Sequence, residues 1–113
     1  MPRDDATLLD IAHSVRMLLD FTHGIDYSSF QSDYKTQSAV LHRLLLLGEA
    51  VKRLSPELQA AHPDIPWKPM AGMRDKLIHA YDEVDLQQVW RTVERDIPRL
   101  LTQLGPLLPP SDE

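Results

Sequence analysis

Apolar residues recur at intervals of three and four along most of this chain, which is the period of an amphipathic α-helix. The first such stretch places its apolar side chains on one face: Leu8, Ile11, Val15 and Leu18. Asp4 or Asp5 is placed to cap the start of this helix, and Gly24 stands where a C-terminal cap is expected. Residues 24–29 then predict a loop, with Ser28 or Ser29 as the next helix cap.

A second, longer helix is predicted from about Ser29 to Leu54. Two adjacent stripes run along it: Val40, Leu44, Leu47, Val51 and Leu54, and beside them Leu41, Leu45 and Gly48. The consecutive leucines at 44–47 cover so much of the circumference that this helix must be covered on more than one side. Either other helices of the same domain provide that cover, or a second copy of the chain does. Gly48 would permit a close helix approach, at a cost of about 1 kcal/mol in helix propensity.

The rest of the chain predicts one short helix and two long ones. Ser55 and Pro56 form a typical helix start, and this helix runs to Ala61 before the prolines of residues 62–66 interrupt it. A third major helix begins near Trp67 and ends near Tyr81, with three apolar residues directed inward: Met70, Met73 and Leu77. Asp85 caps a fourth helix with a regular apolar stripe: Leu86, Val89, Val93, Ile97, Leu100 and Leu104. Pro98 should introduce a kink in that helix.

These elements predict an all-α fold, an antiparallel bundle of four to five helices in residues 1–105. A Pro-rich C-terminal tail is expected in residues 106–113. The length of 113 residues suits one domain with an ordinary hydrophobic core. With 26% charged and 42% apolar residues, the composition is that of a globular protein rather than a disordered one.

The composition excludes several kinds of site. There is no cysteine, and therefore no disulfide, thiolate metal site or cysteine nucleophile. The N-terminus lacks the apolar core of a signal peptide, and no apolar run approaches the ~20 residues that span a bilayer, so a cytoplasmic protein without a membrane partner is expected. The net charge of −5 disfavours a long DNA-binding face. Residues 41–80 nevertheless carry six basic and four acidic residues, which allows a local basic groove.

The segment from Met73 to Tyr81 contains the side chains that best suggest chemistry. Arg74 is a fork-shaped donor suited to phosphate oxygens, and His79 can accept and donate a proton near neutral pH. At about 100° per residue, Asp75 and His79 share one helix face and Arg74 and Tyr81 another, whereas Arg74 and His79 lie about 140° apart. Arginine and histidine would converge if the long arginine side chain reached round, if the helix ended near His79, or if a two-fold axis supplied a second motif.

In such a cleft, Arg74 would hold the scissile phosphate of RNA and offset its developing charge. His79 would act as the general base on the ribose 2′-OH or as the acid on the leaving oxygen. Asp75 could orient the imidazole, and Tyr81 could bind the phosphate or accept a modification. Because the 2′-OH is the internal nucleophile, neither a metal nor a cofactor is required. The structural alternative is a surface Arg–Asp pair, a histidine that stabilises the helix dipole and a half-buried tyrosine.

The string Arg74-x4-His79-x-Tyr81 resembles the motif of the HepT-like toxins, a branch of the HEPN superfamily. Further segments agree with that resemblance, which runs from about Leu8 to Leu104: Gly48-Glu49-Ala50, Ile65-Pro66-Trp67, Gly72-Met73-Arg74, Val84-Asp85 and Val89-Trp90. The resemblance implies a HEPN-like homodimer that acts as a metal-independent ribonuclease and as the toxin of a toxin–antitoxin pair.

The same resemblance assigns roles to individual residues. It makes Arg74 and His79 the catalytic pair and matches Asp75 to a polar residue that often follows the arginine. The expected antitoxin is a small protein of nucleotidyltransferase fold, which would neutralise the toxin by AMPylation, the transfer of AMP to Tyr81. An AMP group there would place a bulky anion where an RNA phosphate must bind.

Two other functions compete with a ribonuclease toxin. The chain could be a non-catalytic HEPN-type scaffold or regulatory partner of a nucleotidyltransferase, or it could chiefly be the substrate of that partner through Tyr81. Glu49 could reach the cleft or a second subunit, or it could be an ordinary paired helix acid. Other polar and aromatic residues are expected to serve the surface or the core rather than RNA or a metal: His13, His23, His42, His62, Lys52, Arg53, Trp67 and Trp90.

Overall fold

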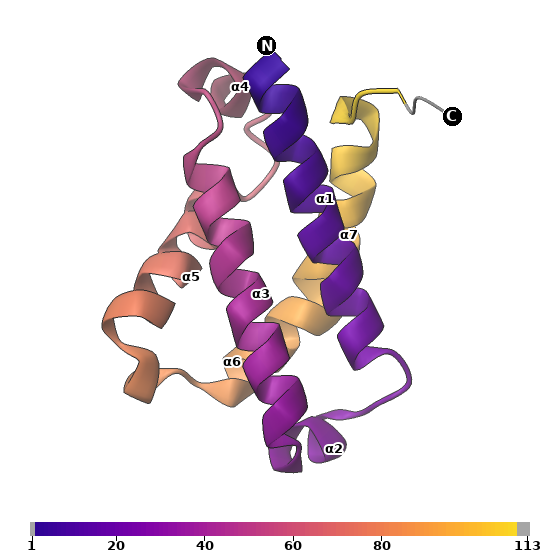
Figure 1. Ribbon diagram of the computed structural model, residues 1–113, viewed down its shortest axis with the longest axis vertical. Coiled ribbons are helices and arrows are strands. Elements are labelled where there is room, and N and C mark those ends of the chain that lie inside the picture. Colours follow the sequence, from indigo (N-terminus) through magenta and orange to yellow (C-terminus); the bar gives the residue numbers. More distant parts are fainter. Residues whose placement is uncertain (1, 111–113) are drawn as a thin grey trace.

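The computed structural model describes residues 2–110 and forms an antiparallel helical bundle (Figure 1). Its elements are α1 (Pro2–Thr22), α2 (Tyr27–Ser32), α3 (Tyr34–Lys52), α4 (Pro56–Ala61), α5 (Trp67–His79), η1 (Tyr81–Glu83), α6 (Leu86–Arg91), the π-helical η2 (Thr92–Asp96), α7 (Ile97–Leu104) and η3 (Gly105–Leu107). The predicted all-α bundle is confirmed, and the described residues contain no strand. No helix among them is long and apolar enough to cross a membrane.

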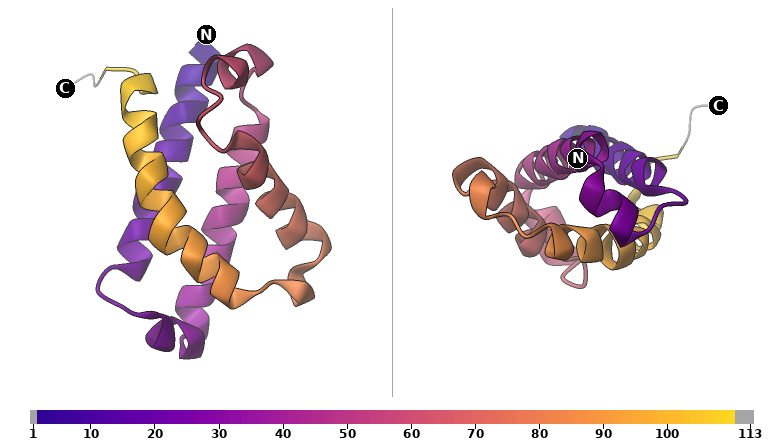
Figure 2. Two further views of the ribbon diagram at one scale, coloured as in Figure 1. Left: turned by 180° about the vertical axis from the view of Figure 1, so that it is seen from behind. Right: turned by 90° about the horizontal axis from the view of Figure 1, so that it is seen from below.

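The long helices alternate in direction around a central α3. α1 and α5 lie on opposite sides of α3, and the continuous run of α6, η2 and α7 returns across the back of the bundle to pack on α1 (Figure 2). Most residues of the predicted stripes are buried in the core: Leu8, Ile11, Val15, Leu18, Val40, Leu41, Leu44, Leu47, Val51, Leu54, Val89, Val93, Ile97, Leu100 and Leu104. Leu45 and Leu86 of these stripes are only partly buried. Most of the cover that the leucine-rich helix needs therefore comes from its own domain.

The helix predicted over residues 29–54 is two helices, α2 and α3, because Asp33 interrupts it. The Asp33 carboxylate accepts hydrogen bonds from the Thr36 amide and hydroxyl at 3.0 and 2.6 Å, which starts a new helix. The side-chain amide of Gln37 then donates to the carbonyls of Phe30 and Gln31, at 2.8 and 2.9 Å, and so satisfies the end of α2. The predicted caps Ser28 and Ser29 were wrong, since Asp26 caps α2 through the Ser29 amide.

α2 turns away from α3 to close one end of the bundle. Its Phe30 is fully buried, at a gain of about 1.5–3 kcal/mol for such a side chain, and its ring lies 5.1 Å from that of Trp90 between centroids. The ring of Tyr27 lies 6.3 Å from the ring of Trp90 between centroids. The indole nitrogen of Trp90 donates to Glu94 at 3.0 Å, so Trp90 is a packing residue, as predicted.

The cap predicted at the start of α1 was also wrong. α1 begins at Pro2, and Asp4 instead turns its buried carboxylate toward Ser55, accepting from its hydroxyl at 2.6 Å and its amide at 3.0 Å. These hydrogen bonds, that of the hydroxyl first, lower the pKa of Asp4 below its ordinary value of 3.8. Ser55 in turn caps α4 through the Leu58 amide at 3.2 Å, which confirms the predicted Ser-Pro start.

Of the remaining predictions about helix ends, those for Gly24 and Asp85 are confirmed. Gly24 has a φ of 75° and ends α1, and Asp85 caps α6 through the Gln87 amide, both as predicted. The kink predicted at Pro98 stays a prediction, but the π-helical turn η2 lies just before this residue, which has no N–H for the carbonyl of Glu94, four residues earlier. In the predicted tail, Leu107 and Leu108 lie against the core, and residues 111–113 fall outside the described part.

α3 and α5 approach each other most closely at Gly48. A methyl group on this residue would overlap the Arg74 side chain and come within 2.8 Å of the Met70 carbonyl oxygen. Gly48 therefore permits the close approach predicted for it, between two helices of one chain. We expect Gly48→Ala to cost about 1–3 kcal/mol of unfolding free energy, measured by urea denaturation, because α5 must move outward.

Gly72 supplies the matched control on α5. A methyl group there meets nothing within 4 Å, so Gly72→Ala should stabilise the protein by about 0.4–1 kcal/mol. Equal effects of the two substitutions would contradict the tight contact at Gly48.

Candidate active site

α5 carries the Arg-x4-His motif and is anchored to the bundle at both ends. Trp67 begins it, with a buried ring whose indole nitrogen donates to the His62 carbonyl at 3.0 Å. Leu77 is buried near the other end, and Met70 and Met73 pack against the core between them. The predicted inward face of this helix is thus confirmed, and it fixes the directions in which Arg74, Asp75 and His79 point.

Arg74 lies on the flank of α5 that meets α3, where Glu49 binds it. Its Nε and Nη2 atoms contact Glu49 Oε1 at 2.8 and 2.7 Å, and its Nη1 donates to Asp75 Oδ1 at 2.8 Å. The arginine side chain is only 22% exposed. Because guanidinium has five N–H donors, at least one on each terminal nitrogen remains for a phosphate oxygen. The two carboxylates thus hold Arg74 in place without using all its donors.

Asp75 connects Arg74 to a basic side chain of α3, Lys52. Lys52 Nζ lies 2.8 Å from the same Oδ1 atom that Arg74 contacts. The hydrogen bond from Lys52, and after it the one from Arg74, lowers the pKa of Asp75 below 3.8. The hydrogen bonds to Asp75 and Glu49 likewise raise the pKa of Arg74 above its ordinary value. Asp75 is therefore ionised at neutral pH, and the four side chains form an alternating chain of charges.

Asp75 and His79 lie one turn apart on one face of α5, as predicted, but no hydrogen bond or ion pair joins them among residues 2–110. The ion pairs of residues 2–110 include Asp75 with Lys52 and Arg74, and none with His79. The long cations of α3 and α5 reach the carboxylate first. His79 itself is exposed at the last residue of α5.

The predicted shared stripe of Arg74 and Tyr81 is also absent, because the helix does not extend to Tyr81. Ala80, with φ −141° and ψ 45°, ends α5, and Tyr81 begins the separate 3₁₀ turn η1. Tyr81 is 55% exposed. The phenol is therefore open to solvent close to His79, but its direction is set by the turn rather than by the helix.

A single chain brings together Arg74, Asp75, Glu49 and Lys52 but leaves His79 on another side of α5. The angle of about 140° between positions 74 and 79 follows from helix geometry, and α5 remains helical through His79. Of the three ways in which the two groups could meet, the predicted helix end near His79 is present, because His79 is the last residue of α5. The contacts of the Arg74 guanidinium with Glu49 and Asp75 oppose a second way, in which the arginine side chain would reach round α5 toward His79.

Glu49 is the site residue that sequence reasoning left undecided. It is separated from Arg74 by 25 positions, so no local period connects the two. The available signal was Gly48 beside it, since a glycine that admits a neighbouring helix also brings the next residue close to that helix. The structure shows Glu49 to be a paired helix acid, and its partner is the motif arginine.

The other residues considered from the sequence lie elsewhere. His13, His23 and His42 are exposed and His62 is partly buried, and no three potential metal ligands of residues 2–110 gather in one place. Arg53 lies 3.7 Å from Asp10 at the surface.

The fold and the motif define an all-α domain with an arginine held on α5 and a histidine and a tyrosine exposed at its end. The family described as "Ribonuclease HepT-like" matches residues 11–106. "Probable ribonuclease HepT" of Thermococcus cleftensis is 47% identical over 93 residues, covering 82% of this chain and 84% of that protein. "Putative RNase MJ0127" of Methanocaldococcus jannaschii is 36% identical over 110 residues, covering 96% and 91%.

A third relative, "Putative RNase MJ0125" of the same organism, is 36% identical over 115 aligned positions that cover 100% of this chain and 99% of that protein. No solved structure matches the chain. The chain belongs to the ribonuclease HepT-like family, which confirms the family predicted from its motif.

The contacts of Asp75 lead to a direct test. In Lys52→Met the largest cause of the low Asp75 pKa is removed, so the carboxyl pKa should rise toward 3.8, as measured by carboxyl-carbon NMR titration. Arg53→Met, which changes the neighbouring base paired with Asp10, should leave it unchanged. An equal rise in both variants would mean that Lys52 acts only through the general charge of α3.

Proposed function

We propose that this chain is an endoribonuclease in which Arg74 and His79 act on RNA phosphodiesters without a metal ion. The observation that carries the proposal is the Arg-x4-His motif on α5 of a HepT-like chain, with the histidine exposed and the arginine held by two carboxylates. Arginine binds phosphate oxygens well, and an exposed histidine is suited to proton transfer near neutral pH.

The proposed reaction uses the ribose 2′-OH as nucleophile. As His79 removes the hydroxyl proton, the 2′ oxygen bonds to phosphorus and the bond to the 5′ oxygen breaks. The leaving oxygen takes up a proton, which gives a 2′,3′-cyclic phosphate and a 5′-hydroxyl end. Arg74 stabilises the charge that develops on the phosphate oxygens, and Glu49 and Asp75 keep its guanidinium oriented. DNA lacks the nucleophile and is not a substrate.

We further propose that two copies of the chain form the working site. In one copy Arg74 and His79 project from different sides of α5, and a two-fold axis would set the histidine of one subunit against the arginine of the other. The flank that holds Arg74 also presents apolar groups suited to such a contact. Leu45 and Leu46 of α3 are only partly buried, and Ile78 of α5 is 42% exposed.

Regulation by a nucleotidyltransferase-fold antitoxin completes the proposed toxin role. Tyr81 is 55% exposed, so its phenol oxygen could attack the α-phosphate of ATP as a nucleophile, with pyrophosphate as the leaving group. The resulting AMP anion next to His79 would repel and obstruct an RNA phosphate.

A non-catalytic scaffold is the second candidate function. It is favoured by the alternating charges of Lys52, Asp75, Arg74 and Glu49, which fasten α5 to α3 and would serve a purely structural end. Under this hypothesis Arg74 has no substrate, and His79 is dispensable to the complex with the nucleotidyltransferase.

The two functions are separated by RNA cleavage in excess chelator. The wild type should cut RNA, and His79→Ala should lose about 10²–10⁴-fold in rate while keeping the same oligomeric state, because general acid–base catalysis contributes about that much. His23→Ala, a change of another exposed histidine, should cut normally. Equal rates for wild type and His79→Ala would favour the scaffold, and cleavage that disappears with chelator would contradict the metal-free mechanism.

Modification of Tyr81 is tested separately with the nucleotidyltransferase partner and labelled ATP. Tyr81→Phe should abolish AMP incorporation, since it removes the acceptor oxygen and little else. Tyr34→Phe is the matched control, because Tyr34 is 78% exposed and lies in another helix. Label that persists in Tyr81→Phe, seen by intact-protein mass spectrometry, would assign the modification to a different residue.

A further inference from the structure

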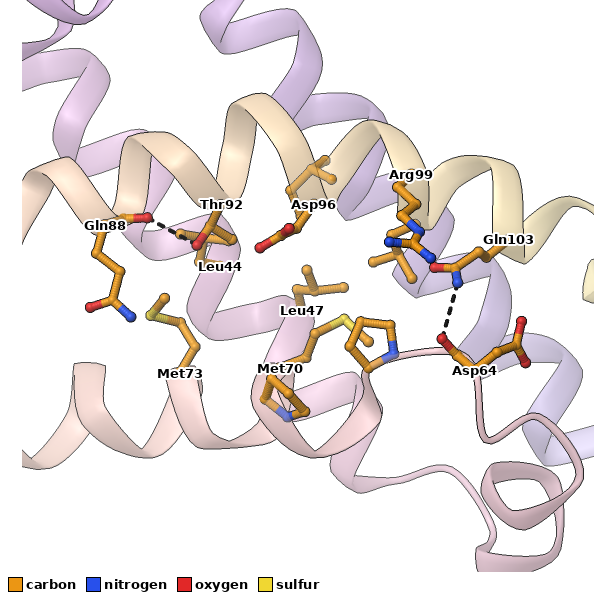
Figure 3. Close-up of a pocket in the computed structure, with 14 residues that line it drawn as sticks. Leu44, Leu47, Asp64, Met70, Met73, Gln88, Thr92, Asp96, Arg99 and Gln103 are labelled. Carbon is orange, nitrogen blue, oxygen red and sulfur yellow. Dashed lines mark hydrogen bonds between the residues drawn. The ribbon is translucent and has the colours of Figure 1, made fainter.

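A cavity lies on the opposite flank of α5 from Arg74, between α5 and the run of η2 and α7. Its volume is about 380 Å³, within the range of about 300–1,000 Å³ typical of small-ligand sites. Four core residues form an apolar floor beneath it: Leu44, Leu47, Ile97 and Leu100. Met70 and Met73 form the wall on the side of α5 (Figure 3). Flexible thioethers make favourable contacts with aromatic rings.

Two opposite charges face this cavity from one side of a helical segment. Asp96 and Arg99 are three residues apart and line the cavity from the same wall, with the Asp96 carboxylate directed toward its centre (Figure 3). Neither residue takes part in the ion pairs found among residues 2–110. At one end the amide of Gln103 donates to the Asp64 carbonyl at 3.1 Å and closes the cavity. An acceptor and a fork-shaped donor are thus available beside an apolar floor.

The chemistry of the walls fits a planar ring with donors and acceptors on adjacent edges. Proteins read RNA mainly through unstacked bases, which they stack on apolar or aromatic groups and hydrogen-bond at their edges. Guanine presents N–H donors on its Watson–Crick edge, which suit a carboxylate such as Asp96. Its O6 and N7 acceptors lie next to them and suit a guanidinium such as that of Arg99. On this complementarity we infer that the cavity binds an unstacked guanine of the RNA substrate.

The surface between this cavity and the motif can carry the RNA backbone. Lys68, Gly72, Lys76 and His79 follow one another at helical intervals on the solvent side of α5, and all four are exposed. The two lysines are absent from the ion pairs of residues 2–110. Gly72 leaves the middle of this stripe without a side chain. An RNA strand that places a nucleobase beside Met73 could therefore run past the two lysines toward His79.

This inference deepens the proposed function, since it gives the ribonuclease a base preference. If the cavity binds a guanine while the RNA is cut at His79, the number of nucleotides between that guanine and the cut bond should be constant. The apolar floor alone would accept any base, so the selectivity is assigned to Asp96 and Arg99. Adenine and the pyrimidines do not combine two adjacent N–H donors for the carboxylate with two adjacent acceptors for the guanidinium.

A titration with mononucleotides tests the site without relying on cleavage. Methyl-labelled methionine is followed by NMR while 5′-GMP, AMP, CMP or UMP is added to the protein. GMP should shift the Met70 and Met73 signals saturably and leave Met17 of α1 unmoved, with the other nucleotides binding about tenfold or more weakly. Arg99→Gln and Asp96→Asn should each remove the preference. Arg95→Gln, which alters an exposed arginine that does not line the cavity, should retain it.

Equal shifts with all four nucleotides, or no shift of Met70 and Met73, would overturn the inference. A second measurement connects the site to the reaction: cleavage sites in a random RNA should lie at a fixed distance from a guanine, and this bias should vanish in Arg99→Gln but persist in Arg95→Gln. GMP binding without any RNA cleavage by the wild type would reject the proposed function and leave the site standing. Unbiased cleavage without GMP binding would reject the site alone.

Discussion

The contact between α3 and α5 at Gly48 is the constraint on which the rest of the site depends. With no side chain at this position, the Arg74 stem and the Met70 carbonyl come against the backbone of α3. Glu49, the next residue of α3, then meets the guanidinium, and Lys52, one turn beyond Gly48, meets Asp75. A wider separation of the helices would break both ion pairs at once. The same contact turns Met70 and Met73 toward the cavity on the other flank of α5.

α5 therefore has three distinct sides that follow from one orientation. One flank holds Arg74 in an alternating chain of charges, the outer side carries exposed lysines and His79, and the other flank borders an apolar cavity. In the proposed reaction, the carboxylates around Arg74 would reduce its net attraction for phosphate but fix its geometry in advance, which would favour charge stabilisation over simple affinity. This balance accords with an acidic protein in which residues 41–80 nevertheless carry more basic than acidic side chains.

Much of the fold could be predicted from the sequence because its signals are local. Gly24, the Ser55-Pro56 start and the Asp85 cap each act within a few residues of their own helix ends, and each was found where predicted. The break at Asp33 was not, since it depends on Gln37 satisfying carbonyls six and seven residues earlier, which no apolar period records. Asp4 was misassigned for a similar reason, because its partner Ser55 is 51 residues away.

The sequence alone determined the helical class, the inward face of each long helix and the identity of Arg74, His79 and Tyr81 as motif residues, because period and spacing are properties of the chain itself. Tertiary structure decided which groups those residues meet. Glu49 and Lys52 reach the motif only because two helices distant in sequence come close at a glycine. The cavity beside Met73 exists only because α7 returns opposite α5. Contacts of this kind depend on the distance and angle between helices, which a one-dimensional pattern does not contain.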